Sequence, residues 1–470
     1  MILTFLAILV AFVLGTSVVV LFWSASTRRS DLPVMIFLAL GIGLGISSCL
    51  FFLWISAFQG RHAGFTRTEA LLAILLSICA IVLRRHARES FKDLHGAQPE
   101  MPQRQINWIL TASFLIALLV ATISFTRLSI AAPHGSFDAW GIWNLHAKFL
   151  FVNDPHWRDG FSKDLAWSHP DYPLLVPASI ARCWSYTATE NTLAPICIAA
   201  LFALATIGLL VSALSLLTTL SQGLLAGTLL LCTPFFVMLG AAQYADAPLG
   251  FFLLATIVLF SLSKRTKGIL ILAGITAGLA AWTKNDGILF VLSFLLAYLI
   301  QNLRNRRWRE YSRDLGAFAA GLLPILAVLI YFKSGTAAYN DLFSRPETLL
   351  HRLTELSRYR TILKALLSES FNFGAWFISI IPCVAFYVLL VGTQQSARKT
   401  ENAICYLALA LTLAGYLMIY LIAPFSLDWL LASSLNRLLT QLWPSILFLV
   451  FLQARTPEEA YSNSATLSHE

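Results

Sequence analysis

Thirteen apolar stretches, separated by short charged segments, follow one another along the chain. A helix needs about 20 predominantly apolar residues to cross a bilayer, and most of the stretches approach that length. We therefore predict an all-α membrane protein, a polytopic transmembrane bundle of about thirteen spans. The predicted spans are residues 2–23, 33–57, 69–83, 107–126, 192–218, 222–240, 248–262, 268–283, 287–301, 315–332, 373–391, 403–422 and 437–453.

Composition excludes a soluble enzyme. Of the 470 residues 58% are hydrophobic and 12% are charged, whereas an ordinary soluble chain is about 45–50% apolar and about 25% charged. The net charge of +9 comes from 33 Lys and Arg against 24 Asp and Glu. In a membrane protein such a surplus orients loops and contacts anionic lipid headgroups, so membrane lipids are expected partners and nucleic acid is not.

The positive charges of the short loops gather on one side when the spans alternate. By the positive-inside rule that side is cytoplasmic, so the N-terminus and the long loops 127–191 and 333–372 are external. Loops of this length are usually functional. The expected location is the inner membrane of a bacterium, crossed many times, with both long loops on the external face.

A charged, proline-containing stretch at 84–106 divides the predicted spans into two groups. We predict an N-terminal three-helix membrane extension at 1–106, a ten-helix transmembrane body at 107–453 and a disordered cytoplasmic tail at 454–470.

Three external turns each present a carboxylate at the same membrane depth: Asp138, Asp246 and Asp286. Each also precedes a helical stretch, and aspartate is a preferred N-cap. Capping is the favoured interpretation of Asp286, and a catalytic or substrate-binding role that of Asp138 and Asp246. A helix over 139–151 would place residues 140, 143, 147, 150 and 151 on one face, as an aromatic interfacial anchor.

The two long loops carry further ionisable groups. Four of the nine histidines lie in 127–191, but no pair has a metal-ligand spacing, so neither a metal site nor another cofactor is predicted. The loop 333–372 has a surplus of Lys and Arg. A solvated basic face is the default interpretation, and a lid over a donor phosphate is the alternative.

Four short motifs resemble the GT-C superfamily of integral membrane glycosyltransferases, most closely the protein O-mannosyltransferase and aminoarabinose transferase type. They are Asp138-Ala-Trp-Gly-Ile-Trp-Asn-Leu-His-Ala-Lys148, His169-Pro-Asp-Tyr-Pro-Leu-Leu, Tyr244-Ala-Asp246-Ala-Pro-Leu and Thr283-Lys-Asn-Asp-Gly. The resemblance covers roughly residues 107–453. It implies that these residues form a GT-C-like transmembrane catalytic domain whose external loop carries short interfacial helices. It implies transfer of a sugar from a polyprenyl-phosphate donor to a glycan, lipid or protein acceptor on the external face, usually with inversion.

The resemblance also implies roles for particular residues. Asp138 matches the family's catalytic base, and Asp246 an acid implicated in substrate binding or catalysis. The family commonly has Lys-Ala-Lys where this chain has His146-Ala-Lys148, so only the second cation is retained.

The chemistry of the residues agrees with this assignment. Displacing a phosphate from an anomeric carbon needs a base for the acceptor proton and cations for the departing phosphate. Asp138 is the expected base, and Lys284 and Arg437 are the expected phosphate contacts, although Arg437 could also be an ordinary snorkelling arginine. Further candidates for substrate binding are Lys148, His169, Tyr172 and Tyr244.

The alternative function is a transporter or flippase of lipid-linked glycans. Transporters place their coupling residues near the bilayer midplane on broken helices, whereas the charges here concentrate at the external edge.

Overall fold

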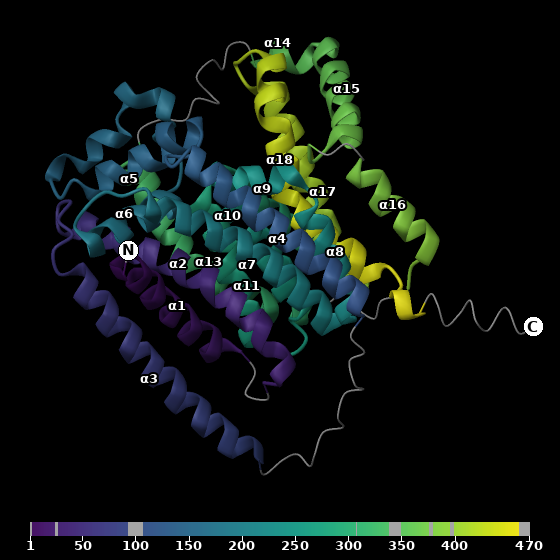
Figure 1. The fold of residues 1–470 in the computed structure, drawn as a ribbon, viewed down its shortest axis with the longest axis horizontal. Coiled ribbons are helices and arrows are strands. Elements are labelled where there is room, and N and C mark those ends of the chain that lie inside the picture. Colours follow the sequence, from purple (N-terminus) through teal and green to yellow (C-terminus); the bar gives the residue numbers. More distant parts are fainter. Residues whose placement is uncertain are drawn as a thin grey trace, which may run out of the picture.

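The computed structural model in Figure 1 describes residues 2–23, 27–92, 107–306, 308–337, 349–375, 379–394 and 399–459. All named elements of these ranges are helices, which confirms the all-α membrane fold. The first nine α-helices are α1 Ile2–Phe22, α2 Leu32–Ala57, α3 Phe65–Lys92, α4 Trp108–Ala131, α5 Asn144–Phe151, α6 Leu175–Thr187, α7 Leu193–Leu217, α8 Leu220–Leu231 and α9 Pro234–Ala241. The others are α10 Asp246–Ser261, α11 Lys267–Thr283, α12 Asn285–Asn305, α13 Trp308–Gly335, α14 Leu349–Thr354, α15 Leu356–Asn372, α16 Ile380–Val391, α17 Lys399–Ile422 and α18 Leu427–Gln453.

The predicted count of thirteen spans is not confirmed. In the described ranges nine helices are long and apolar enough to cross a membrane, or ten if α8 and α9, bent by 66° at their junction, form one span. The other three predicted spans are the shorter apolar helices α10, α11 and α16. A helix of 16 residues such as α10 is only about 24 Å long, less than the roughly 30 Å hydrocarbon core.

Helices α10 and α11 form the centre of the bundle. Every residue of α10 is buried, and this helix packs against α7, α11 and α18. On its other side, α11 packs against α12 and α13. Because α10 faces protein all round, its apolar residues are no longer ordered into one stripe, as expected for a fully buried helix.

The N-terminal helices pack against the rest of the bundle. Helix α1 contacts α2, α3 and α6, and α2 also contacts α6 and α7. A buried ion pair ties α3 to α6, since the Nε of Arg182 lies 2.7 Å from a carboxylate oxygen of Glu69 and neither side chain is exposed. The Arg182 Nη2 also donates to the carbonyl of Ala7 at 2.7 Å. The division at 84–106 stays a prediction, and residues 93–106 lie outside the described residues.

The segment between α4 and α7 carries the predicted short helices. It contains a π-helical turn Ala139–Trp143, then α5, the 3-10 helices Pro155–Phe161 and Lys163–Ser168, and α6. The single aromatic face predicted for 139–151 is wrong. Trp140 is exposed, whereas Trp143, Ala147 and Leu150 are fully buried, because the wider π turn shifts the residues before it out of phase with α5.

Helices α14 and α15 lie in the second long loop, of which residues 338–348 are outside the described ranges. Figure 1 shows them with α16 on the flank opposite to α3. The solvated basic face predicted for this loop is confirmed for Arg360 and Lys364, which are exposed. It is wrong for Arg352, which is buried and donates to the carbonyl of Ile422. Arg358 donates to the carbonyl of Tyr420 at 2.7 Å. Both arginines therefore bind the C-terminal carbonyls of α17, where cations are favoured.

Two boundaries in the structure differ from the predicted ones. Helix α18 begins at Leu427, so Arg437 lies within this helix and not at its external end. The predicted tail 454–470 is described only to residue 459, where residues 457–459 are helical.

Candidate active site

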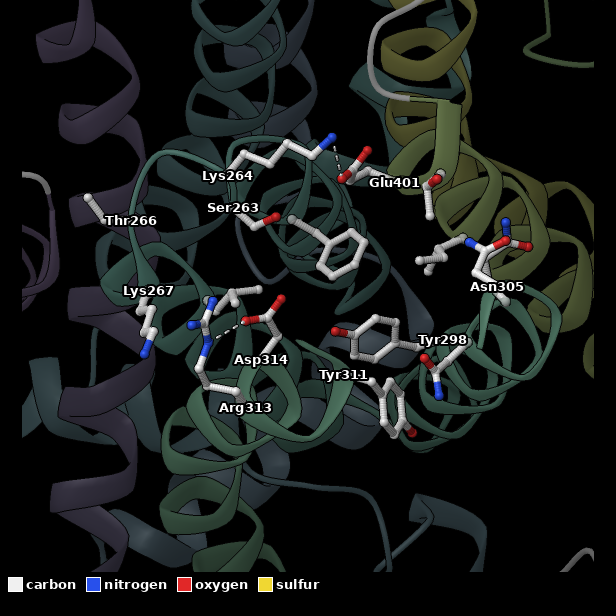
Figure 2. Close-up of a pocket in the computed structure, with 16 residues that line it drawn as sticks. Ser263, Lys264, Thr266, Lys267, Tyr298, Asn305, Tyr311, Arg313, Asp314 and Glu401 are labelled. Atoms are coloured by element: carbon white, nitrogen blue, oxygen red, sulfur yellow. Dashed lines mark ion pairs between the residues drawn. The ribbon is translucent and has the colours of Figure 1, made fainter. Parts of the chain in front are cut away.

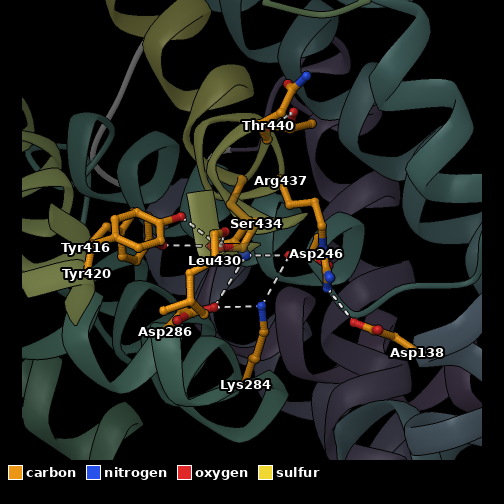
Figure 3. Close-up of polar contacts among 12 residues, drawn as sticks. Asp138, Asp246, Lys284, Asp286, Tyr416, Tyr420, Leu430, Ser434, Arg437 and Thr440 are labelled. Atoms are coloured by element: carbon orange, nitrogen blue, oxygen red, sulfur yellow. Dashed lines mark hydrogen bonds and ion pairs between the residues drawn. The ribbon is translucent and has the colours of Figure 1, made fainter. Parts of the chain in front are cut away.

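Asp246, at the first position of α10, is the centre of a group of charged side chains (Figure 3). Its side chain is fully buried. One carboxylate oxygen accepts from Lys284 Nζ at 3.2 Å, and the other accepts from Arg437 Nη2 at 2.9 Å and Nε at 3.3 Å. A buried carboxylate is tolerated when it is paired and hydrogen-bonded in this way.

Arg437 joins two of the predicted carboxylates. The same Nη2 that donates to Asp246 lies 2.7 Å from a carboxylate oxygen of Asp138. The guanidinium also lies over the ring of Tyr244, 4.5 Å from its centroid, in a cation–π contact. We call Asp138, Asp246, Asp286, Lys284 and Arg437 the charged cluster.

Lys284 lies in the one-residue turn between α11 and α12. Its Nζ lies 2.8 Å from Asp286 Oδ2 as well as 3.2 Å from Asp246 Oδ1. Burial disfavours the ammonium form, but the two carboxylates outweigh that effect and raise the pKa of Lys284 above its ordinary value. This lysine is therefore a fixed cation.

The turn needs the glycine of the Thr283-Lys-Asn-Asp-Gly motif. A Cβ on Gly287 would lie 1.9 Å from the carbonyl oxygen of Ala280. Only a residue without a side chain lets the start of α12 pack this closely on the end of α11. The close approach holds Lys284 and Asp286 beside Asp246.

Hydrogen bonds tie the turn before α10 to the segment that carries Asp138. Gln243 donates to the carbonyl of Pro133 at 3.0 Å and accepts from the side chain of Asn144 at 3.3 Å. The backbone N–H of Ser136 donates to the carbonyl of Ala242 at 3.2 Å. These contacts hold together two motifs that are about a hundred residues apart in the chain and that both contain a carboxylate bound to Arg437.

None of the three aspartates is an observed N-cap through its side chain. Asp138 precedes the π turn without a side-chain cap bond, and the N-cap positions of α10 and α12 are Ala245 and Lys284. The preferred interpretation of Asp286 as a cap is therefore wrong, because Lys284 and Gln441 engage its carboxylate instead.

Sequence reasoning missed Gln441, which is fully buried on α18. Its Nε2 donates to Asp246 at 2.5 Å and to Asp286 at 3.3 Å, and its Oε1 accepts from Tyr416 at 2.7 Å. Its place four residues after Arg437, on the same helical face, is the signal that could have identified it.

The remaining predicted site residues are not all brought to the charged cluster. Tyr172 stacks between Trp143 and His169, with ring centroids 5.6 Å and 4.7 Å away. Burial is the main cause that raises the pKa of Tyr172, with smaller effects from the charges of Lys284 and Asp286, so the phenol stays neutral. Lys148 is half exposed and pairs instead with Glu190 at 3.4 Å.

His146 stands where the resembled family has a lysine, and here it is an uncharged residue of the interior. Its ring is fully buried, and Nε2 lies 3.2 Å from Ser168 Oγ. Burial, and to a lesser extent the nearby His169, lowers the pKa of His146 to about 3. It therefore supplies no cation at neutral pH.

A second polar group borders the cluster. Asn285, next to Lys284, donates to Asp171 Oδ2 at 2.8 Å and accepts from Lys333 Nζ at 2.8 Å. Lys333 Nζ also lies 3.3 Å from Asp171 Oδ2. This group links the His169-Pro-Asp-Tyr motif, the lysine turn and the end of α13.

Comparison with known proteins finds a similarity over part of the chain. Residues 169–331 match the family model of dolichyl-phosphate-mannose-protein mannosyltransferase. The match confirms the predicted resemblance over these residues. No curated protein and no solved structure matches the chain.

The mannosyltransferase-family match contains Asp246, Lys284, Tyr244, Tyr172 and His169. It supports a multi-pass membrane glycosyltransferase that uses a lipid-linked sugar donor. Asp138, Lys148 and Arg437 lie outside the matched residues. Arg437 contacts Asp138, which is outside the match, and Asp246, which is inside it. Among the described residues, no group of three or more His, Cys, Asp or Glu could hold a metal ion.

Proposed function

We propose that the protein transfers a sugar from a polyprenyl phosphate to an acceptor hydroxyl on the external face of the membrane, with inversion at the anomeric carbon. The observation that carries this proposal is the Arg437 guanidinium shared between Asp138 and Asp246, with Lys284 beside it. The catalytic unit is residues 107–453, in the inner membrane of a bacterium.

The charge of the cluster explains how a donor could be accepted. Three carboxylates against two cations leave one net negative charge, which disfavours an added phosphate unless a pair rearranges. Asp138 is the carboxylate that can separate from Arg437, because its side chain is 19% exposed whereas that of Asp246 is fully buried. A phosphate that takes Arg437 would release the carboxylate of Asp138.

The two aspartates then have different roles. The freed Asp138 accepts the proton of the acceptor hydroxyl as that oxygen bonds to the anomeric carbon. The bond between this carbon and the phosphate oxygen breaks, and Arg437 and Lys284 stabilise the departing polyprenyl phosphate. Asp246 positions both cations. We propose that Tyr244, Tyr172 and His169 line the binding site of the sugar. Lys148 would contact the donor only after its ion pair with Glu190 breaks.

The alternative of a lipid-linked glycan transporter has less support. The charged side chains of the cluster pair with one another around one helix end, and the matched family is one of glycosyltransferases.

The test exploits a substitution that keeps the shape of the side chain. Asp138→Asn cannot act as a base, so sugar transfer from labelled polyprenyl-phosphate donors in host membranes should fall at least about a hundredfold. Asp164→Asn, exposed in the same segment, is the matched control and should retain activity. Thermal unfolding of each purified protein reports its folding.

Two results would contradict the proposal. Full activity of a correctly folded Asp138→Asn protein would exclude this residue as the base. A wild-type protein that transfers no sugar from any donor, but moves lipid-linked glycans across vesicles, would favour the transporter.

A further inference from the structure

A polar cavity has a volume of about 420 Å³, and Figure 2 shows the side chains that line it. It lies at the opposite end of α10 from the charged cluster. Helix α10 begins at Asp246 and ends at Ser261, and Ser263 and Lys264 directly after it line the cavity. A helix of this length spans about 24 Å. The cavity therefore belongs to the other membrane face and takes no part in the proposed transfer.

Two buried polar atoms of the cavity lining lack hydrogen-bond partners among the described residues. Asn302 on α12 is 6% exposed, and its Nδ2 donor is unpaired. Glu401 on α17 has an unpaired Oε2 acceptor, while its Oε1 binds Lys264 Nζ at 2.9 Å. Leaving buried donors and acceptors unmet is costly, so a ligand that offers both an acceptor and a donor would fit.

The cavity also has a surplus of positive charge. Lys264, Lys267 and Arg313 line it, against Asp314 and Glu401. The Nε of Arg313 is only loosely paired with Asp314, at 3.8 Å. Lys267 has no ion-pair partner in the described part of the chain. Two cations are therefore open to an anion.

Aromatic residues border the cavity. The rings of Tyr298 and Tyr311 lie with centroids 4.8 Å apart, and Trp308 lies 6.1 Å from Tyr311 and is half exposed. Trp and Tyr are enriched at the headgroup level of membranes. Basic pockets between helices at this level bind lipid headgroups.

We propose that this cavity binds the headgroup of a phospholipid whose phosphate carries an alcohol with a hydrogen-bond donor, such as ethanolamine or glycerol. The phosphate would contact Lys267 and Arg313, and Asn302 Nδ2 would donate to a headgroup oxygen. The ammonium or hydroxyl group of the alcohol would donate to Glu401 Oε2. Choline has no N–H or O–H to donate, so phosphatidylcholine would leave that acceptor unmet.

The experiment measures binding of short-chain dihexanoyl phospholipids to the purified full-length protein in detergent by calorimetry. Phosphatidylethanolamine and phosphatidylglycerol should bind at least about tenfold more tightly than phosphatidylcholine. Equal affinity for all three would overturn the proposal. Inorganic phosphate and O-phosphoethanolamine serve as ligands without acyl chains. If either of them binds as tightly as the lipids do, the lipid assignment is overturned.

Variants locate the site. Arg313→Gln and Asn302→Leu should each weaken phosphatidylethanolamine binding about tenfold. Arg304→Gln, an exposed cation on the same helix as Asn302, is the matched control and should bind as wild type does. Arg313 is 63% exposed, so its variant tests the site even if Asn302→Leu fails to fold. Unchanged binding by Arg313→Gln would overturn the proposed site.

Discussion

Arg437 makes a combination of contacts that lysine would not reproduce. It donates to Asp246 through two nitrogens, reaches Asp138 at 2.7 Å and lies over Tyr244. Lysine is a point charge without a planar fork. We expect Arg437→Lys to reduce kcat/KM for the lipid-linked donor by about 10- to 100-fold, measured with purified protein. Arg360→Lys, exposed on α15, should have no effect, and an unaffected Arg437→Lys would contradict the shared-arginine geometry.

His146 makes folding sensitive to acid. Its pKa is about 3 in the folded protein, against about 6.5 when unfolded. In this window the unfolded chain binds a proton that the folded protein excludes, so stability falls as the pH decreases. From pH 7 to pH 5, wild type should lose about 2 kcal/mol more unfolding free energy than His146→Gln.

Unfolding in detergent at both pH values tests this expectation. His351→Gln, exposed on α14, is the control and should follow wild type. A His146→Gln protein with the same pH dependence as wild type would show that the pKa of His146 is the same in the folded and unfolded protein.

The charged members of the cluster could be predicted from sequence because an ionised side chain beside an apolar stretch is conspicuous. Gln441 could not, since a neutral amide inside a long helix has many harmless explanations. Asp286 was misassigned for a related reason: capping is a local rule, whereas its contacts with Lys284 and Gln441 are set by the packing of three helices.

At the scale of elements, the junction of α11 and α12 depends on one glycine. A Cβ at Gly287 would collide with the Ala280 carbonyl, and moving α12 away would separate Lys284 from Asp246. Gly287→Ala should destabilise the protein by about 1–3 kcal/mol and lower sugar transfer at least about tenfold. Gly316→Ala is the control, because nothing lies within 4 Å of its Cβ.

Both variants are compared by thermal unfolding and by transfer rate. Equal stability of Gly287→Ala and wild type would mean that the junction tolerates a methyl group, contrary to the geometry described.

The long apolar helices were predictable from apolar runs, whereas helix ends, and helices α14 and α15 in the predicted loop 333–372, were not. The start of α18 was placed at 437 because Ser433, Ser434 and Asn436 interrupt the apolar run. The helix nevertheless begins at Leu427, and Ser434 within it has a protein partner, the hydroxyl of Tyr420 at 2.8 Å. Hydropathy reports how well a segment suits contact with lipid, whereas residues buried inside a helix bundle contact protein and need not be apolar.

At the scale of the whole molecule, the Glu69–Arg182 pair connects the N-terminal helices to the segment before α7. Both side chains are fully buried, so removal of one charge leaves the other uncompensated. Glu69→Gln should lower the free energy of unfolding by about 3–5 kcal/mol. Glu190→Gln, which breaks the exposed pair with Lys148, should cost no more than about 1 kcal/mol.

Denaturant unfolding of the purified variants measures both effects. If the two substitutions cost the same, the N-terminal helices would be only loosely attached, and the predicted extension 1–106 would gain support as a separate unit.

The contacts between the start of α10 and α18 also determine when the charged cluster can form during synthesis of the protein. Asp246 leaves the ribosome 191 residues before Arg437, a delay of about 10–40 s at about 5–20 residues per second. Until α18 arrives, this carboxylate lacks its arginine and its glutamine. The charged cluster is therefore incomplete until α18 has been made, and under the proposed function a nascent chain cannot transfer sugar before that point.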